Sequence, residues 1–254
     1  MATIAATANL SSSFEAVGSE KPTVGVLAVQ GNFEAHARAF QNAGARAILV
    51  RKPAELDGLD GLAMPGGEST TMLRFLERDG FIEVLREFLC VTPCFATCAG
   101  CILLAREVLS PAQASLGLLD ITVERNAYGR QIDSTILTQR TELPGGPLEM
   151  VFIRAPRITR TGAGVEVLAR RDGSPTLIRQ GHLVAATFHP EMTDDLRVQG
   201  LFLDLIHAHR SAKKRPSRGY ATQAGRGIPL HSKREGAQAL ARIARRLIGE
   251  DYAP

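Results

Sequence analysis

Apolar residues in the first half of the chain fall into short continuous runs that alternate with helix-like segments. The runs predict strands at 24–29, 47–50, 61–64 and 94–96, and the segments between and after them predict helices at 33–43, 71–78, 81–89 and 99–108. Continuous apolar runs of this length are typical of strands buried on both faces of a parallel sheet. The pattern therefore predicts an α/β fold: a three-layer αβα, doubly wound, mostly parallel sheet, flavodoxin-like, with sites at the carboxyl ends of its strands.

From Leu118 onward the pattern becomes rich in strands. Gly and Pro turns separate predicted strands at 121–124, 134–137, 150–154, 166–169, 176–180 and 182–188, and a helix follows at about 194–207. Hairpin signals fall at 171–174 and 180–182. We expect an antiparallel strand excursion before the last strand of the core.

The chain's 254 residues allow one sizeable α/β domain with tails. We expect a disordered leader over 1–22, one domain over 23–208, and a basic, mostly disordered tail over 209–254, where the spacing at 235–249 suits an amphipathic helix. From His207 onward eleven Lys and Arg stand against three acidic residues, a net charge of +8, whereas the preceding residues carry −4. We interpret this tail as a solvated basic segment, not a nucleic-acid site.

The stretch Pro93–Ala105, PCFATCAGCILLA, is the strongest chemical signal. An apolar strand breaks there at small residues and resumes as a helix, which would hold Cys98 at the apex of a tight elbow. The amides that begin the following helix would favour the thiolate of Cys98, the form that acts as a nucleophile. The alternative is that Cys98 is an ordinary buried cysteine.

All four cysteines, Cys90, Cys94, Cys98 and Cys101, lie within twelve residues of one another. Cys98 and Cys101 form a CxxC pair, but a zinc site would need a second ligand pair at a suitable distance, so we expect no metal. A redox dithiol stays open as an alternative. We expect reduced thiols in a cytoplasmic protein, with Cys94 and Cys101 as packing residues. No apolar run reaches the roughly 18 residues of a membrane helix, and the first twenty residues lack the Lys and Arg of targeting signals.

A cysteine nucleophile needs a base, and the segment Phe188–Met192, FHPEM, offers one. On an extended segment His189 and Glu191 would point to the same side, so that the carboxylate could fix the imidazole tautomer. A pair of this kind often only decorates a strand end. Together with the elbow it predicts a Cys-His-Glu arrangement.

The third signal is the segment Met64–Phe75, MPGGESTTMLRF. A strand leads into the Gly66-Gly67 pair, and a helix follows whose N-cap we expect among Ser69, Thr70 and Thr71. Such a loop can turn backbone amides toward a developing oxyanion. The alternative is a tight turn with no chemical role.

These three stretches, in this order, resemble the class I (triad) glutamine amidotransferases. The segments 28–36, 115–134 and 152–156 narrow the resemblance to the glutaminase subunits of pyridoxal 5′-phosphate synthase, over roughly 23–206. The resemblance implies that Cys98, His189 and Glu191 hydrolyse L-glutamine to L-glutamate and ammonia. One departure is Ala96, where the family's elbow usually has Gly.

The resemblance also implies how glutamine and a partner are bound. Its glutamine and oxyanion contacts fall on Gly66, Gly67, Glu68, Arg125, Ile153 and Arg154. It implies a hetero-oligomer with a synthase subunit that receives the ammonia and completes the oxyanion hole. No cofactor is expected, since pyridoxal phosphate is the product of the complex, and neither a membrane nor nucleic acid is expected as a partner.

Three other interpretations remain open. The same chemistry could serve a different synthase, although the segment VERNAYGRQ, 123–131, argues against it. The chain could be a binding subunit that has lost turnover through Ala96. A cysteine peptidase or chaperone of a related αβα fold is the third, but such families usually lack the His-Pro-Glu segment.

Overall fold

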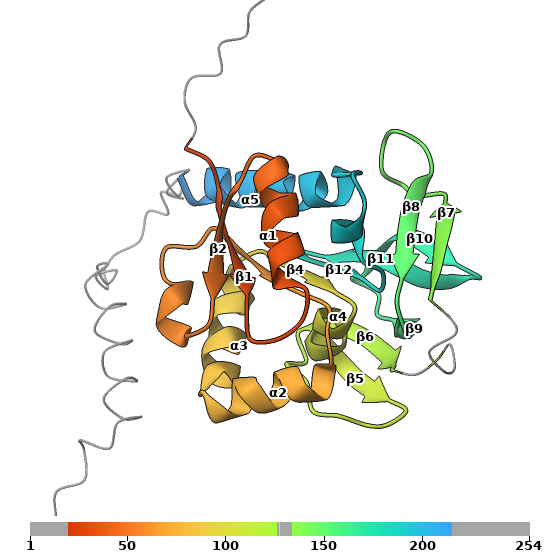
Figure 1. The fold of residues 1–254 in the computed structure, drawn as a ribbon, viewed down its shortest axis with the longest axis horizontal. Helices are drawn as coiled ribbons and strands as arrows, with labels where there is room; N and C mark the ends of the chain where they lie inside the picture. Colours follow the sequence, from red (N-terminus) through yellow and green to blue (C-terminus); the bar gives the residue numbers. More distant parts are fainter. Residues whose placement is uncertain (1–19, 126, 128–133, 215–254) are drawn as a thin grey trace, which may run out of the picture. The chain divides into compact units, whose positions relative to one another are not determined.

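A seven-stranded sheet forms the centre of the protein (Figure 1). The computed structural model describes residues 20–125, 127 and 134–214, all in the first of two compact units, Met1–Arg215. The sheet order is β10 (Glu166–Arg171), β11 (Ser174–Gln180), β12 (Leu183–Ala186), β4 (Cys94–Thr97), β3 (Gly61–Met64), β1 (Thr23–Leu27) and β2 (Arg46–Val50). Neighbours from β12 to β2 pair in parallel, and β10, β11 and β12 pair antiparallel. The predicted fold class is confirmed.

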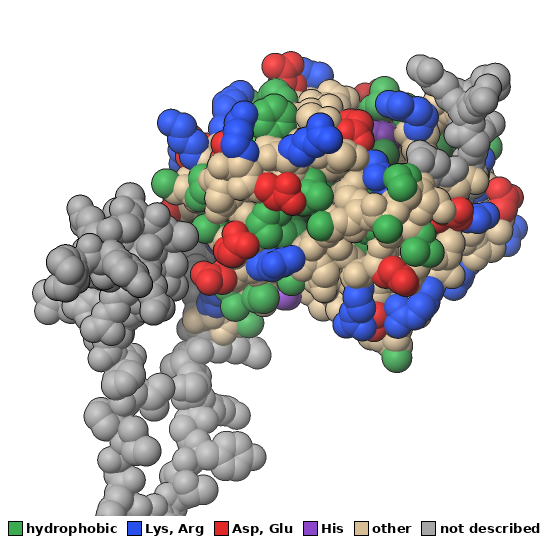
Figure 2. All heavy atoms as spheres, turned by 90° about the horizontal axis from the view of Figure 1, so that it is seen from below, with side chains coloured by type: hydrophobic (Ala, Val, Ile, Leu, Met, Phe, Trp, Pro, Cys, Tyr) green, Lys and Arg blue, Asp and Glu red, His purple; other side chains and the backbone are tan. Residues whose placement is uncertain are grey.

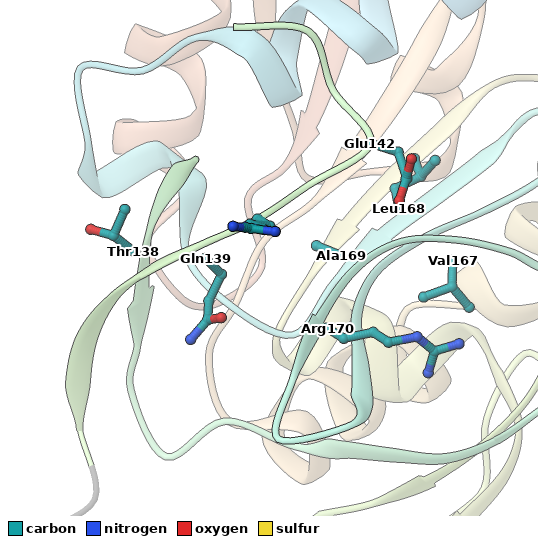
Figure 3. A pocket seen from close by; sticks show the side chains of 8 residues that line it. Thr138, Gln139, Glu142, Val167, Leu168, Ala169 and Arg170 are labelled. Carbon is teal, nitrogen blue, oxygen red and sulfur yellow. The ribbon is translucent and has the colours of Figure 1, made fainter. Parts of the chain in front are cut away.

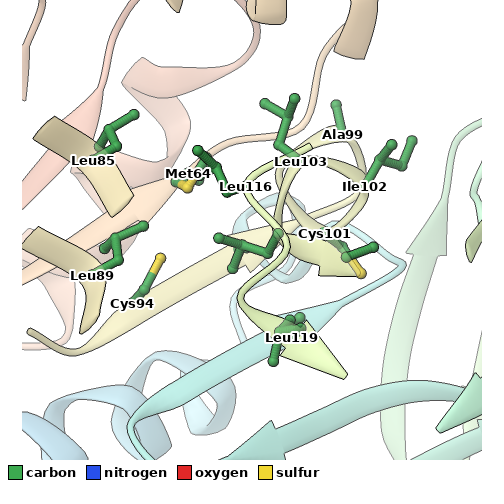
Figure 4. Close-up of a cluster of buried hydrophobic side chains, with 14 of the residues drawn as sticks. Met64, Leu85, Leu89, Cys94, Ala99, Cys101, Ile102, Leu103, Leu116 and Leu119 are labelled. Atoms are coloured by element: carbon green, nitrogen blue, oxygen red, sulfur yellow. The ribbon is translucent and has the colours of Figure 1, made fainter. Parts of the chain in front are cut away.

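Alternate residues of the central strands feed two separate cores, one on each face of the sheet. On one face Val26 and Phe95 pack in a cluster with Phe40 of α1 (Phe33–Asn42) and Phe202 of α5 (Arg197–Lys214). On the other face the cluster includes Met64 and side chains from α2 (Ser69–Arg78), α3 (Phe81–Val91) and α4 (Ala99–Leu104), as Figure 4 shows in part. Apolar runs without alternation are what a sheet buried on both faces requires.

Two smaller sheets lie outside the central one. The first contains β5 (Ala105–Leu109), β6 (Leu119–Glu124) and β9 (Arg157–Thr161), and the second pairs β7 (Thr135–Gln139) with β8 (Leu148–Phe152). Short 3₁₀ turns, η1 (Pro53–Leu56) and η3 (Pro190–Met192), complete the described elements. Both predicted hairpins are confirmed, since β10 joins β11 through Asp172-Gly173 and β11 joins β12 through Gly181-His182.

Four predictions about elements were wrong. The elbow helix, expected over 99–108, ends at Leu104, and the chain continues as β5, which pairs with β6. Strand β9 was missed because polar residues dominate its sequence, RITRT. The last helix was expected at about 194–207 and instead spans Arg197–Lys214, beyond the domain end expected at 208. The N-cap of α2 is Glu68, whose carboxylate accepts from the amides of Thr70 and Thr71.

Charges of both signs are interspersed over the face of the described residues that Figure 2 shows. Among the residues described, no helix is long and apolar enough to cross a membrane. The predicted leader up to residue 19 and the tail from residue 215, including the segment 235–249, lie outside the described residues.

Candidate active site

Three adjacent strands lead to four of the predicted site residues at one edge of the sheet. Strands β3, β4 and β12 are parallel neighbours, and at their carboxyl ends stand the glycine pair, Cys98 and His189. The amide of Cys98 donates to the carbonyl of Ala186 at 2.9 Å, which ties the elbow to the end of β12. The amide of His189 donates to the carbonyl of Val151 at 2.8 Å. The edge therefore assembles segments that are far apart in the sequence.

Cys98 occupies a strained backbone conformation at the predicted elbow. Its φ is 47° and its ψ is −104°, values that a non-glycine residue rarely adopts and that cost about 1–3 kcal/mol. A methyl group at Gly100 would collide with the carbonyl oxygen of Met64, so only glycine fits there. Ala96 is absent from the residues of positive φ and lies within β4, so its methyl group causes no backbone strain.

His189 and Glu191 form a buried pair. The imidazole Nδ1 of His189 lies 2.8 Å from Oε1 of Glu191, and their side chains are 8% and 0% exposed. The prediction that this segment is extended was wrong, because Pro190–Met192 is a 3₁₀ turn. The turn folds the carboxylate of Glu191 back onto the ring of His189. The pairing itself is confirmed.

The pKa values of this pair show strong coupling. Burial lowers the pKa of His189, but contacts with Cys98 and Glu191 outweigh burial and raise that pKa to about 10. Burial raises the pKa of Glu191, whereas His189 and His36 lower it to about 2. His189 is therefore protonated and Glu191 ionised at neutral pH, which places a positively charged imidazolium beside Cys98.

The glycine pair after β3, Gly66-Gly67, lies against the side chains of Cys98 and His189. A Cβ atom at Gly66 would stand 2.5 Å from Cε1 of His189 and 3.2 Å from Cβ of Cys98. The carbonyl oxygen of Gly66 accepts from the amide of Asn32 at 3.4 Å. Because a trans peptide directs N–H opposite to C=O, the Gly67 amide points away from Asn32. The backbone here approaches the site as closely as glycine allows.

Cys98 opens into a small cavity of about 100 Å³. Its lining comprises Gly67, Glu68, Ser69, Cys98, Ile102, Arg125, Ile153 and Arg154. Nη2 of Arg125 donates to Thr70 Oγ1 at 2.8 Å and to Glu68 Oε1 at 3.3 Å, and the Cys98 sulfur lies 4.0 Å from the carbonyl oxygen of Ile153. All the residues predicted to bind glutamine therefore meet at this cavity, except Gly66, which lies against Cys98 and His189.

The Glu68 carboxylate has several partners within the protein. Burial raises its pKa, but hydrogen bonds from Thr71 and Thr70 lower that pKa to about 2. These bonds, with the ion pair to Arg125, fix the start of α2 and the Arg125 guanidinium together. The carboxylate thus positions neighbouring groups of the cavity wall.

The other cysteines lack the surroundings of a redox pair. No disulfide joins the four free thiols, and Cys94 and Cys101 are both fully buried, as the packing interpretation predicted. Burial raises the pKa of Cys94 well above its usual range and that of Cys101 to about 12. The described residues contain no cluster of three or more His, Cys, Asp or Glu that could hold a metal ion.

Two polar residues at this edge were missed by the sequence reasoning. The amide oxygen of Gln30 accepts from the amide of Glu68 at 2.8 Å, and a Cβ atom at Gly67 would collide with it. His36 of α1 is fully buried, with Nε2 3.3 Å from Oε2 of Glu191. A polar ring on the core face of a helix, between Ala35 and Ala39, was the available signal for His36.

A wider cavity lies elsewhere among the described residues. It measures about 470 Å³ and is lined by residues of β7 and β10 and of the segment between β7 and β8, among them Gln139, Glu142 and Arg170 (Figure 3). None of Cys98, His189 and Glu191 lines it. Volume alone therefore does not locate the reactive groups.

The fold and site together define an α/β protein with a strained cysteine elbow and a buried His-Glu pair at the carboxyl edge of a doubly wound sheet. The chain belongs to the SNO glutamine amidotransferase family, whose model matches residues 26–208. It is 56% identical over 191 residues to the pyridoxal 5′-phosphate synthase subunit PdxT of Koribacter versatilis, covering 75% of this chain and 99% of the relative.

Two further similarities agree with this membership. The PdxT subunit of Thermotoga maritima is 48% identical over 187 residues, covering 72% of this chain and 98% of the relative. A solved structure described as a glutamine amidotransferase superposes with a TM-score of 0.68 at 45% identity, covering 72% of this chain and 98% of that chain.

Proposed function

We propose that this protein hydrolyses L-glutamine to L-glutamate and ammonia and passes the ammonia to a synthase subunit for pyridoxal 5′-phosphate biosynthesis. The observation that carries the proposal is the strained Cys98 at the cavity, beside a protonated His189 held by Glu191 at 2.8 Å. The names of its PdxT relatives support the synthase as partner.

In the proposed reaction the Cys98 thiolate attacks the side-chain amide carbon of glutamine. The carbonyl oxygen becomes an oxyanion, which amides of the Gly66-Gly67 loop stabilise. His189 then gives its proton to the departing nitrogen, which leaves as ammonia and creates a thioester on Cys98. His189, now neutral, takes a proton from water, and the resulting hydroxide releases glutamate and restores the thiolate.

The cavity wall would hold the substrate. Arg125 and Arg154 line the cavity that contains Cys98, and a guanidinium suits the α-carboxylate of glutamine. We assign Ile153 a contact through its carbonyl oxygen, which already faces the sulfur. Glu68 contributes its backbone at the cavity and orients Arg125 through its carboxylate.

A partner is part of the proposal because free ammonia is mostly protonated at neutral pH and is then a poor nucleophile. Direct transfer to a synthase active site keeps it reactive. We propose that the two subunits form a hetero-oligomer in the cytoplasm, and that the synthase chemistry belongs to the partner.

The test is glutamate production from L-glutamine by the full chain, measured with and without the synthase subunit. We expect Cys98→Ala to abolish hydrolysis while leaving the fold and partner binding intact. The matched control is Cys90→Ala, at an exposed cysteine outside the cavity, which should keep full activity. Retained hydrolysis in Cys98→Ala, or no hydrolysis by the wild type with its partner, would refute the proposal.

A further inference from the structure

His36 lies in the core of the protein although its side chain is polar. It occupies the first half of α1, is 0% exposed, and its ring packs edge-on against Phe95 with 6.0 Å between ring centroids. An imidazole buried against a phenylalanine ring costs free energy unless its nitrogens find partners. In the part of the chain described, Nδ1 of His36 has no hydrogen-bond partner. Its polar contacts must therefore come from Nε2.

Nε2 of His36 faces two groups that belong to the reactive edge. It lies 3.0 Å from Oγ1 of Thr97, the residue before Cys98, and 3.3 Å from Oε2 of Glu191. The tautomer with its hydrogen on Nε2 places that hydrogen between a hydroxyl and a carboxylate, whereas a bare nitrogen there would be repelled by Glu191. The His36 ring thus contacts both Glu191 and the residue next to Cys98.

The Glu191 carboxylate depends on this contact. Its Oε1 pairs with His189, while Oε2 accepts no well-directed hydrogen bond within the described residues. The side chain is 0% exposed, so bulk water does not stabilise Oε2, and the approach of His36 compensates its charge. Without His36 the carboxylate could lower its free energy by rotating away from His189 or by taking up a proton.

We propose that His36 is a positioning residue for glutamine hydrolysis: it holds the Glu191 carboxylate in line with His189 and anchors Thr97 beside the nucleophile. This inference rests on the proposed function for its kinetic consequence. Helix α1 thereby becomes part of the reactive edge, although His36 does not line the cavity that contains Cys98.

The test compares His36→Leu, which keeps the bulk and removes the polar contact, with His36→Gln, which restores an N–H donor. The matched control is His182→Leu, because the His182 ring also makes one hydrogen bond, to the carbonyl of Leu89 at 2.8 Å. His182 precedes β12 and His189 follows it, so the control residue lies at the opposite end of that strand. Steady-state kinetics use L-glutamine with saturating synthase subunit. Circular dichroism and thermal melts check that each variant is folded.

We expect kcat of His36→Leu to fall by about tenfold to a hundredfold with KM little changed, since a misplaced base costs rate and not binding. His36→Gln should recover much of the loss, and His182→Leu should retain wild-type kcat. Equal kcat in His36→Leu and His182→Leu would overturn the proposal. If His36→Leu does not fold, His36→Gln and Thr97→Val decide: both must fold, the first with near wild-type kcat and the second with reduced kcat.

A second readout works without hydrolysis: the rate at which iodoacetamide alkylates Cys98 in the isolated full chain, followed by mass spectrometry of the Cys98 peptide from pH 4 to 9. The titratable groups facing Glu191 are His189 from its own segment and His36 from α1, and His189 in turn faces Cys98. We expect His36→Leu to move the acid limb of alkylation to higher pH, because a less anchored Glu191 holds the His189 proton less well. His36→Gln and His182→Leu should keep the wild-type limb.

The two readouts separate the two proposals. A wild type that does not hydrolyse glutamine refutes the proposed function, while a shifted alkylation limb in His36→Leu would still support the positioning role. If the wild type hydrolyses glutamine normally and His36→Leu shows the same pH dependence of Cys98 alkylation as the wild type, the positioning role alone is refuted. A uniform loss of rate without a shifted limb, and without rescue by Gln, would show that His36 serves only packing.

Discussion

Two clusters of charged side chains in this protein have similar distances and opposite surroundings. At the sheet edge, Glu191 meets His189 at 2.8 Å with side chains 0% and 8% exposed. On the sheet of β5, β6 and β9, Asp120 meets Arg106 at 2.8 Å and Arg160 at 3.0 Å, but these arginines are 61% and 52% exposed. Water competes for the second cluster and is excluded from the first.

The difference shows that burial and not distance decides what an ion pair does. An exposed pair contributes about 0–1 kcal/mol because solvent screens it and ordering the side chains costs entropy. A buried pair holds its geometry and shifts pKa values, but the loss of one partner leaves a charge with no compensation. The edge cluster is therefore suited to chemistry, and the surface cluster to modest local stabilisation.

The largest effects should come from breaking the buried cluster. We expect His189→Ala to lower kcat for glutamine by about 10⁴-fold or more, and Glu191→Gln to lower it less, since an orienting group contributes less than the base. Both variants are compared by steady-state kinetics with saturating synthase subunit. A larger loss in Glu191→Gln than in His189→Ala would mean that the base lies elsewhere.

Filling the space beside the cluster should come next. Gly66→Ala would place a methyl group 2.5 Å from Cε1 of His189, so the ring must shift; we expect about a hundredfold lower kcat and about 1–3 kcal/mol lower stability. The matched control is Gly164→Ala, where a Cβ would meet nothing within 4 Å. Denaturant unfolding and kinetics measure the two effects, and wild-type kcat in Gly66→Ala would contradict the assigned geometry.

Acid should distinguish the two clusters directly. The pKa of Glu191, lowered from its usual 4.5 to about 2, corresponds to up to about 3 kcal/mol of stability that is present above pH 4.5 and lost as the pH falls toward 2. The stability difference between wild type and Glu191→Gln should therefore shrink between pH 5 and 3 in urea unfolding. Asp120→Asn should stay within about 1 kcal/mol of wild type throughout.

The smallest effect is expected at the departure from the family's elbow sequence. Ala96 lies in a strand without positive φ, so Ala96→Gly should lower stability by about 0.5–1 kcal/mol, through unfolded-state entropy, with no gain in kcat. Ala185→Gly, at the residue paired with Ala96 in β12, is the matched control and should behave alike. A clear rise in kcat for Ala96→Gly alone would show that the methyl group hinders the elbow.

The central sheet could be predicted because the sequence of each buried strand is itself a continuous apolar run. Segments such as 24–29 and 94–96 are continuous apolar runs, and glycine follows the first and third of the predicted strands closely. The start of β5 could not be predicted, because Ala105–Leu109 continues an apolar helical run and only pairing with β6 makes it a strand. Strand β9 likewise depends on its pairing partner.

The site followed the same division. Cys98, His189 and Glu191 could be identified as candidates because they lie in short motifs of chemically reactive residue types, and the structure brings them together. The contact between His36 and Glu191 joins residues 155 positions apart, and no local pattern encodes it. The 3₁₀ turn at 190–192 was missed because a Pro after His suited an extended segment equally well.

The order of the strands also bears on how the protein is made. Cys98 directly follows β4, but β12, the strand that pairs with β4 on one side and leads to His189, begins 86 residues after Thr97. A ribosome-bound chain that has just emerged past the elbow therefore presents an unpaired edge of β4 and a cysteine without its base. Cys98 can meet the pair of His189 and Glu191 only after synthesis has passed Glu191, so a chain that ends before that residue lacks the assembled cluster.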